Sequence, residues 1–418
     1  MHSLARGLVP RIVSIVLIAS AASAAAQTQT LRTLTLERAL ELALQRNPEL
    51  ATATWEEQAT EAAVEQAGVL PNPELELTGD NLGNERKRDA GDQTASLQIS
   101  QLIELGGKRA RRVRLAQTAR DVAAWEFRLK RAEIVARVKQ AFFDQLAWQQ
   151  RIALAEDSVR LADQVTATVG KRVQAGKVSP VEEIKAQLAR SGATVEREQA
   201  RRELAAARAR LGALVALPGQ DLGEVQGDLE TLEPLPDFET LSASAQTNAD
   251  LGRWASEVER RRAGVDVEQA KAVPDVTLKG GVARFSTFND NAYMLGLSIP
   301  LPVFDRNRGA ILESHRRLDK ARDEQRSAQL RLRAELSEAY ERAQAVAMEL
   351  RLLRESILPG SRSAFDAATK GYELGKFGIL DVLDAQRALF QARTQYLRAL
   401  AEYRRSASEI ERLSGTAL

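Results

Sequence analysis

Cysteine is absent from the 418 residues of this sequence, and histidine occurs only twice, at His2 and His315. Disulfide bonds, a lipid-modified N-terminal cysteine, and zinc or copper sites built from histidine and cysteine are therefore excluded within one chain. No nucleophile–base set, phosphate-binding loop or metal-ligand spacing is present either. We expect no enzyme activity, no resident metal and no cofactor.

Long apolar stretches are scarce. An apolar run over residues 12–22 follows two arginines and is itself followed by a small-residue cleavage signal. This pattern predicts a secretory signal peptide over residues 1–26, cleaved between Ala26 and Gln27, with an uncleaved membrane anchor as the alternative. No later run approaches the ~20 apolar residues that a membrane helix needs, so any crossing of a membrane must use strands.

An excess of charge of one sign is also lacking. The sequence has 59 basic and 57 acidic residues, and the predicted signal peptide contains two of the arginines and no acid. The mature chain is therefore balanced, which gives no electrostatic case for a nucleic-acid partner. A dense basic run at the start of one helix needs compensation, because it opposes the helix dipole. Acids of neighbouring helices are the first candidates and anionic lipid headgroups the second. The run comprises Lys108, Arg109, Arg111, Arg112 and Arg114.

The predicted helices are arranged around two glycine-containing turns, each of which lies between two long helical patterns. The dipeptides Gly176-Lys177 and Gly375-Lys376 lie 199 positions apart, and six residues after each glycine stands an acid, Glu182 or Asp381. We interpret both turns as the far ends of helical hairpins, here called the tips.

The order of predicted elements around the tips is duplicated. Asn248-Ala249-Asp250-Leu251 repeats the pattern of Asn47-Pro48-Glu49-Leu50 at an offset of 201. Pro359-Gly360 should bend or break one long helix. The predicted helices are 37–46, 49–70, 108–175, 180–217, 252–273, 308–374 and 379–413. The predicted organisation is a signal peptide 1–26, a first repeat 27–217, an irregular equatorial link 218–245 and a second repeat 246–418.

The helix lengths indicate a wall of parallel rods. The helices 108–175 and 308–374 are each ~100 Å long, and the shorter helices placed end to end reach the same length. Heptad spacing in the last helix gives two adjacent apolar seams, which let a helix pack against neighbours on both sides. An ordinary antiparallel coiled coil is the alternative.

Alternating apolar and polar residues predict two strand pairs, within 73–102 and 274–300. Four strands cannot close into a barrel, and each unpaired backbone group in lipid costs several kcal/mol. The chain must therefore share a barrel with copies of itself, two copies giving eight strands and three giving twelve. A four-stranded sheet in the periplasm is the alternative.

These features resemble the outer-membrane efflux protein family, of which TolC is the best known. The resemblance covers the mature chain and rests on the duplicated order and on the tip sequence of residues 371–385. It implies a mainly α fold with a small β part: a trimeric tunnel of twelve helices and a shared twelve-stranded β-barrel in the outer membrane of a Gram-negative bacterium. The stretch 101–109 looks like the heavy-metal, CzcC-like branch.

The resemblance also implies a periplasmic gate. The family counterparts of Asp381 and Asp384 line the constriction, where a trimer would place six carboxylates that attract cations. Tyr372 takes the position of the gate tyrosine and Glu182 that of its acidic partner, so we expect a hydrogen bond between them. Phe377 stands where the family often has an arginine, which speaks against a salt-bridge latch there. Asp381 and Asp384 as mere charges at a helix start are the alternative.

The resulting hypothesis is the exit duct of a tripartite efflux pump of the resistance-nodulation-division type, exporting divalent heavy-metal cations. Its partners would be two sister chains, outer-membrane lipid, a periplasmic adaptor and a proton-driven inner-membrane pump. The adaptor would meet the tips at Gly176, Lys177, Gly375, Lys376 and Phe377. A multidrug duct and a pore-less periplasmic scaffold or adhesin stalk are the alternatives.

Overall fold

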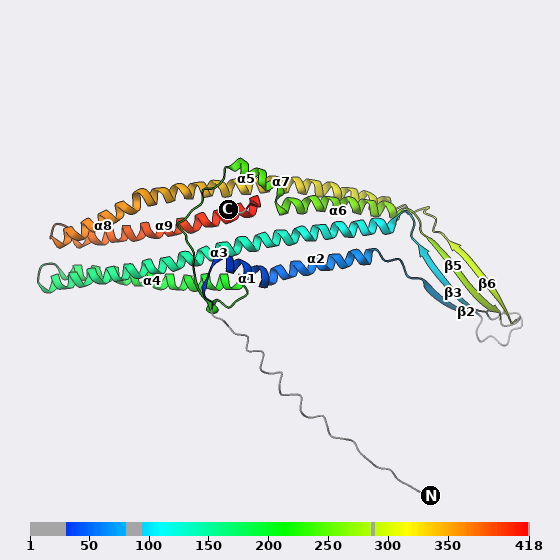
Figure 1. Cartoon of the computed structure of the whole chain (residues 1–418), viewed down its shortest axis with the longest axis horizontal. Helices are drawn as coiled ribbons and strands as arrows, with labels where there is room; N and C mark the ends of the chain where they lie inside the picture. Colours follow the sequence, from blue (N-terminus) through cyan, green and yellow to red (C-terminus); the bar gives the residue numbers. More distant parts are fainter. Residues whose placement is uncertain (1–30, 81–93, 286–288, 417–418) are drawn as a thin grey trace, which may run out of the picture.

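The computed structural model describes residues 31–80, 94–285 and 289–416. The predicted signal peptide, with Ala26 and Gln27, lies outside this range. The described chain is elongated: helices run along most of its length, a sheet stands at one end, and both tips lie at the other (Figure 1). Among the described helices, none combines the length and hydropathy needed to cross a membrane.

Eight helices of the described part form the long body. The first half contributes α1 (Leu36–Arg46), α2 (Pro48–Ala67), α3 (Lys108–Gln174) and α4 (Pro180–Leu214). The second half contributes α6 (Ala249–Lys271), α7 (Arg308–Leu352), α8 (Leu358–Glu373) and α9 (Ile379–Ser414). On the tip side, α4 packs on α3, α3 on α9, and α9 on α7 and α8; on the sheet side, α2 packs on α3, α3 on α6, and α6 on α7. In this order α2 continues the line of α4, and α6 continues the line of α9.

We call the places where α2 meets α4 and where α6 meets α9 the two joints. A buried asparagine lies at each of them. Asn47 caps the start of α2 by accepting from the Glu49 N–H at 2.9 Å, and its Nδ2 donates to the Leu214 carbonyl at the end of α4 at 2.8 Å. Asn248 does the same between α9 and α6, donating to the carbonyls of Arg412 and Leu413 at 2.9 and 2.8 Å. One side chain thus satisfies orphan groups of two helix ends.

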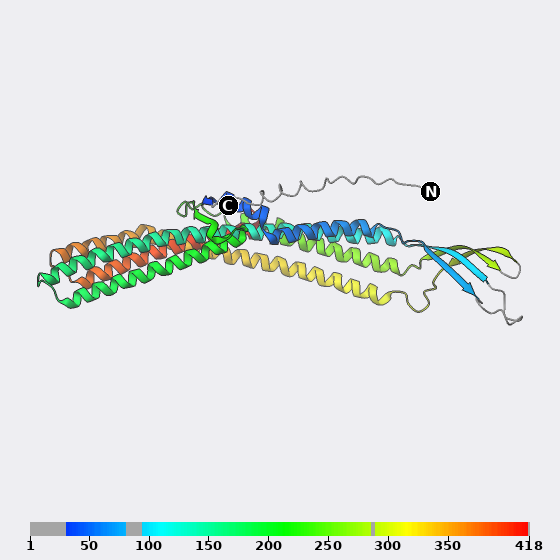
Figure 2. The same cartoon turned by 90° about the horizontal axis from the view of Figure 1, so that it is seen from below.

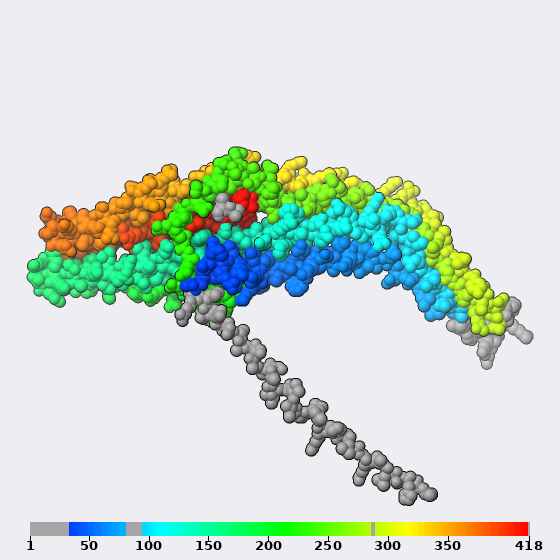
Figure 3. All heavy atoms as spheres, in the orientation of Figure 1, coloured from blue at the N-terminus to red at the C-terminus, as the bar shows by residue number. Residues whose placement is uncertain are grey.

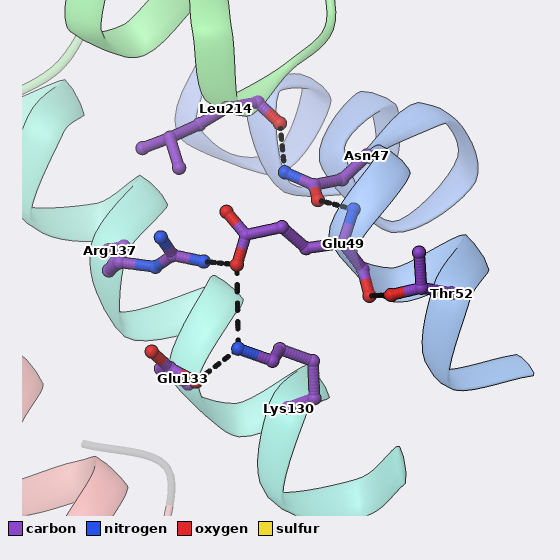
Figure 4. A network of polar contacts seen from close by, with 7 residues as sticks. All are labelled: Asn47, Glu49, Thr52, Lys130, Glu133, Arg137 and Leu214. Carbon is purple, nitrogen blue, oxygen red and sulfur yellow. Dashed lines mark hydrogen bonds and ion pairs between the residues drawn. The ribbon is translucent and has the colours of Figure 1, made fainter. Parts of the chain in front are cut away.

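An ion-pair network fixes the first joint to the long helix α3 (Figure 4). The Glu49 carboxylate accepts from Arg137 at 2.7 Å and from Lys130 at 3.4 Å, and Lys130 also contacts Glu133 at 2.9 Å. The hydrogen bond from Arg137 is the main reason why the pKa of Glu49 lies below its usual value. The α2 end of the joint is therefore held against α3 as well as against α4.

Midway along the body, a side segment covers one face of the helices (Figures 2 and 3). It contains the parallel strand pair β1 (Leu31–Leu34) and β4 (Leu222–Val225), and the short helix α5 (Phe238–Ser244). Gln149 of α3 exchanges two hydrogen bonds with the backbone of Val225, at 2.9 and 3.2 Å. From α9, Tyr403 donates to the Glu233 carbonyl at 2.8 Å. We call residues 218–245, which include β4 and α5 but not β1, the equatorial segment.

At the other end stands a four-stranded antiparallel sheet in the order β2-β3-β5-β6. Its strands are β2 (Glu74–Asp80), β3 (Thr94–Ile103), β5 (Val276–Phe285) and β6 (Asp290–Ser298). The register aligns Leu77, Leu97, Val282 and Tyr293 in one row across the sheet, and Leu75, Ile99, Gly280 and Leu295 in the next. These rows share one face, on which Tyr293 and Leu295 are 88% and 93% exposed. The chain therefore presents an apolar sheet face with no covering of its own.

Two of the five basic residues in the run at the start of α3 pair with acids, and these acids lie beside the strands rather than on neighbouring helices, where they were expected. Lys108 pairs with Asp275 at 2.6 Å, and Arg112 pairs with Glu104 at 2.5 Å. Arg112 also donates to the Ala67 carbonyl at the end of α2 at 2.9 Å. The run thus fixes the helical body to the base of the sheet.

Three local predictions were wrong. Helix α2 ends at Ala67 rather than Leu70, and α4 ends at Leu214 rather than Leu217, because the chain turns towards the prolines at 71 and 218 before reaching them. The link 218–245 is not wholly irregular, since it contains β4 and α5. The expected disruption at Pro359 is present: α7 ends at Leu352, and a π-helical segment, Leu353–Ile357, shifts the hydrogen-bond register just before the proline and leads into α8.

The Asn248 joint can be tested by the substitution Asn248→Asp. Aspartate keeps the capping acceptor but replaces two donors with a carboxylate facing two carbonyl oxygens, which should cost roughly 1–3 kcal/mol. We expect a clearly lower melting temperature by circular dichroism. Asp237→Asn is the matched control, because Asp237 caps only its own helix α5. Equal melting temperatures for the two variants would contradict the bridging role.

Candidate functional site

The two tips are built by the same backbone motif. Gly176 and Gly375 have φ values of 67° and 72°, a left-handed conformation that favours glycine. The next N–H closes each turn onto the carbonyl five residues back: Lys177 onto Arg172 at 2.9 Å, and Lys376 onto Gly371 at 2.8 Å. This Schellman-type closure satisfies the last carbonyls of α3 and α8 and turns the chain back.

Tyr372, one turn before the second tip, connects the two hairpins. Its side chain is buried, and its hydroxyl donates to Glu182 Oε2 of α4 at 3.2 Å. Arg172 of α3 donates to the Tyr372 carbonyl at 2.6 Å, and its guanidinium lies over the Tyr372 ring, 4.4 Å from the centroid. Two residues of the first hairpin therefore hold one residue of the second, by a hydrogen bond at each end of the tyrosine and a cation–π contact.

The electrostatics keep this tyrosine neutral. Burial raises the pKa of Tyr372 above its usual value, the negative charge of Glu182 raises it further, and Arg172 acts in the opposite direction. Since the shift is upward, the hydroxyl remains protonated at neutral pH and can donate to the carboxylate. Glu182 lies in the first turn of α4, where the helix dipole favours its negative charge.

Phe377 fills the space over Gly371. A Cβ atom placed on Gly371 would lie 2.1 Å from the Phe377 ring, so only glycine permits this approach. The aromatic ring therefore packs on its own hairpin, and the cation that joins the two hairpins is Arg172.

The two predicted gate carboxylates have local partners. Asp381 Oδ2 accepts from the Gly378 N–H at 2.9 Å and so caps α9. Asp384 lies one turn further on, largely exposed, with Arg387 at 3.5 Å. The capping role accounts for part of Asp381, as the alternative reading expects. An acidic ring needs further chains and stays a prediction.

Lys177 and Lys376 are exposed at the tips, and Phe377 is half exposed. Contact of these residues with an adaptor stays a prediction. In the ranges 31–80, 94–285 and 289–416, no group of three or more His, Cys, Asp or Glu side chains is placed to hold a metal ion.

Arg172 is the residue at this site that sequence reasoning missed. Aligning the tips on their glycines places Arg172 opposite Gly371, four residues before each turn. This alignment does not reveal the contact, because Arg172 reaches Tyr372 and the space over Gly371 is filled by Phe377.

The comparison with known families decides the classification. A model described as "Outer membrane efflux protein" matches residues 39–217 and 240–416. The chain belongs to the outer membrane efflux protein family. The resemblance drawn from the tip sequence and the duplicated order is thereby confirmed.

Relatives place the chain near the heavy-metal members of this family. It is 38% identical to the cobalt-zinc-cadmium resistance protein CzcC of Cupriavidus metallidurans, over 91% of this chain and 90% of that protein. It is 28% identical to the nickel-cobalt-cadmium resistance protein NccC of Alcaligenes xylosoxydans xylosoxydans, over 60% of this chain and 57% of that protein. The predicted CzcC-like branch is confirmed.

Solved structures share the fold. The structure of a membrane protein from Pseudomonas aeruginosa superimposes with a TM-score of 0.80 at 20% identity, covering 91% of this chain and 90% of that one. A structure of CusC gives a TM-score of 0.78 at 19% identity, covering 91% and 92%. The mainly helical fold with a small sheet is therefore confirmed as that of this family.

Arg172 gives a direct test of how the hairpins are joined. Arg172→Gln removes the cation–π contact and the charged hydrogen bond to Tyr372, so we expect faster hydrogen–deuterium exchange in tip peptides covering residues 365–380. An increase of about tenfold corresponds to the loss of one hydrogen bond to a charged group. Arg160→Gln is the control, because Arg160 pairs only with Asp157 on the surface of its own helix. Unchanged exchange in Arg172→Gln would remove Arg172 from the site.

Proposed function

We propose that the protein is the outer-membrane exit duct of a tripartite efflux pump and that it exports divalent heavy-metal cations. The observation that carries this is the four-stranded sheet, which has an exposed apolar face and two unpaired edges, β2 and β6, at the end of a ~100 Å helical body. Such a sheet suits lipid on its apolar face, provided that other strands pair with its edges.

Three copies of the chain would complete the wall. Edge strand β6 of one chain would pair with β2 of the next, giving twelve strands and a closed barrel. The helical layer also has two free sides, α4 on one and α7 with α8 on the other. Both carry exposed apolar side chains that suit burial between chains: Val181, Ile184 and Val195 on α4, and Leu330, Met348, Leu352 and Ile357 on the opposite side.

The tips would form the periplasmic gate. Tyr372, Glu182 and Arg172 join the two hairpins of a chain, and in a trimer Asp381 and Asp384 would bring six carboxylates to the mouth. Such a ring attracts cations and repels anions. A periplasmic adaptor meeting the exposed tips would spread the hairpins, while a proton-driven inner-membrane pump would supply the energy. The duct itself carries out no chemistry.

The metal cargo is supported by the relatives. CzcC and NccC are named for resistance to cobalt, zinc, nickel and cadmium, and CzcC matches nearly the whole chain. The pyoverdine export outer membrane proteins OpmQ of Pseudomonas putida and Pseudomonas aeruginosa match less well than CzcC, at 27% and 23% identity. Divalent metal ions are therefore the favoured cargo over larger organic molecules.

The gate contact can be tested in planar lipid bilayers. Tyr372→Phe and Glu182→Ala each remove the hydrogen bond between the hairpins, and we expect a higher mean conductance than in the parent. A net loss of ~1 kcal/mol would favour the open tip by about fivefold. Tyr340→Phe is the control, since the Tyr340 hydroxyl bonds only with Gln344 of its own helix. If all three variants conduct like the parent, the contact is not a latch.

The cargo can be tested by gene deletion in the native host. We expect reduced survival on zinc, cobalt and cadmium, unchanged survival on a drug panel, and recovery when the gene is restored. Copper is the comparison metal, because CzcC and NccC are not named for it. Sensitivity to drugs alone would support the multidrug alternative. A protein found as a soluble monomer, rather than a trimer in the outer membrane, would exclude the duct.

A further inference from the structure

A groove of about 650 Å³ runs along the helical body beside the tips, between α4 and α9, with α3 as its floor. This volume lies in the range of small-molecule sites. Arg151 and Ser158 form the floor. Around the axis of α3 they lie on the side roughly opposite to Gln149, which binds the equatorial segment. The groove therefore opens on the face of the wall opposite to the equatorial segment.

Two buried polar groups in this groove have no partner. Gln386 is only 8% exposed, and its Oε1 makes no hydrogen bond within the described part of the chain. The same holds for the buried Thr394 Oγ1, two turns further along α9. Buried polar groups are normally satisfied. Because the Gln386 Oε1 points into the protein, the amide Nε2, which has no acceptor among the described residues, is the atom that can donate to a ligand headgroup.

Among the charged side chains that line the groove, the cations outnumber the carboxylates by one. Asp384 pairs with Arg387 at 3.5 Å, and Glu196 lies 3.8 Å from Arg151. Lys185 is half-buried and has no ion pair or side-chain hydrogen bond with any residue in the described ranges. An unpaired ammonium beside an amide Nε2 that can donate favours a negatively charged headgroup.

Lys185 and Gln386 stand at nearly the same level above the tips. Lys185 is the sixth residue of α4 and Gln386 the eighth of α9, and both helices begin at their tips. Their positions along the two helices, counted from the tips, therefore differ by two residues, or about half a helical turn. One headgroup can thus reach both side chains across the groove.

The remaining walls are apolar and open. Leu188 of α4 and Leu380 of α9 are 67% and 52% exposed, and Phe390 lies one turn beyond Gln386. Small residues of α4, including Gly192 and Ala193, leave room beside them. Such walls suit the hydrocarbon part of a ligand.

We propose that this groove binds an amphipathic organic anion, with its carboxylate or similar headgroup on Lys185 and Gln386 and its apolar part along Leu188, Leu380 and Phe390. The proposal builds on the proposed duct, in which the equatorial segment lies outside and the groove faces the lumen. Bound there, the anion narrows the passage next to the gate and reduces conductance. Asp384 of the proposed carboxylate ring also lines the groove, where Arg387 pairs with it, so the remaining charge in the groove attracts an anion rather than a cation.

Octanoate is the probe, with octyltrimethylammonium as the cation of similar tail length. We expect octanoate on the tip side of a planar bilayer to reduce the conductance of the parent channel saturably. In Lys185→Gln, block should require about tenfold more octanoate, the loss expected for a hydrogen bond to a charged group. Gln386→Leu should also weaken block. Lys171→Gln, which removes an equivalent exposed charge on α3 outside the groove, should leave block unchanged.

Equal block by the two probes, or equal block in the parent and Lys185→Gln, would overturn the site. A parent that forms no channel would refute the duct instead. In that case equilibrium dialysis of labelled octanoate against the purified protein tests the groove alone. Saturable binding that Lys185→Gln weakens supports the site, and binding that does not saturate rejects it.

Discussion

The unpaired backbone groups along β2 and β6 constrain the whole architecture. Each strand in the middle of the sheet has partners on both sides, whereas these two have a row of free N–H and C=O groups on one side. An apolar face as exposed as that of Tyr293 and Leu295 needs a nonpolar environment, in which such groups must find partners. In the proposed duct, strands of other chains would satisfy these edges, and the helical bodies attached to the strand pairs would then form a ring as well.

A closed wall of helices needs helical segments of equal length. The two asparagine joints provide this equal length. Helices α3 and α7–α8 cross the body without interruption of helical structure, while α2 with α4, and α6 with α9, reach the same extent in two pieces. Asn47 and Asn248 join the pieces by satisfying groups of both helix ends. The equatorial segment binds at the same level, so the interruption that weakens the wall is also where it is reinforced.

Local signals in the sequence were enough for the elements but not for their contacts. Glycine pairs and prolines set the limits of α3, α4 and α9 to within three residues, and alternation identified all four strands of the sheet. The pair β1–β4 escaped notice because each strand has four residues and its partner lies nearly two hundred residues away. The π-helical segment before Pro359 escaped because proline alone indicates a disruption and not how the chain absorbs it. At the tip, family resemblance suggested Tyr372 and Glu182, while Arg172 acts through a contact between hairpins that no single-segment pattern contains.

The charges near the tip follow from the same construction. Asp381 caps α9 and Glu182 stands in the first turn of α4, so acids gather where helices begin. Lys185 is the sixth residue of α4, on the groove beside α9, where Asp384 and Glu196 lie near arginines and no carboxylate among the described residues pairs with Lys185. In the proposed duct, the acids at the mouth would attract metal ions. The groove beside them would hold organic anions through the remaining cation.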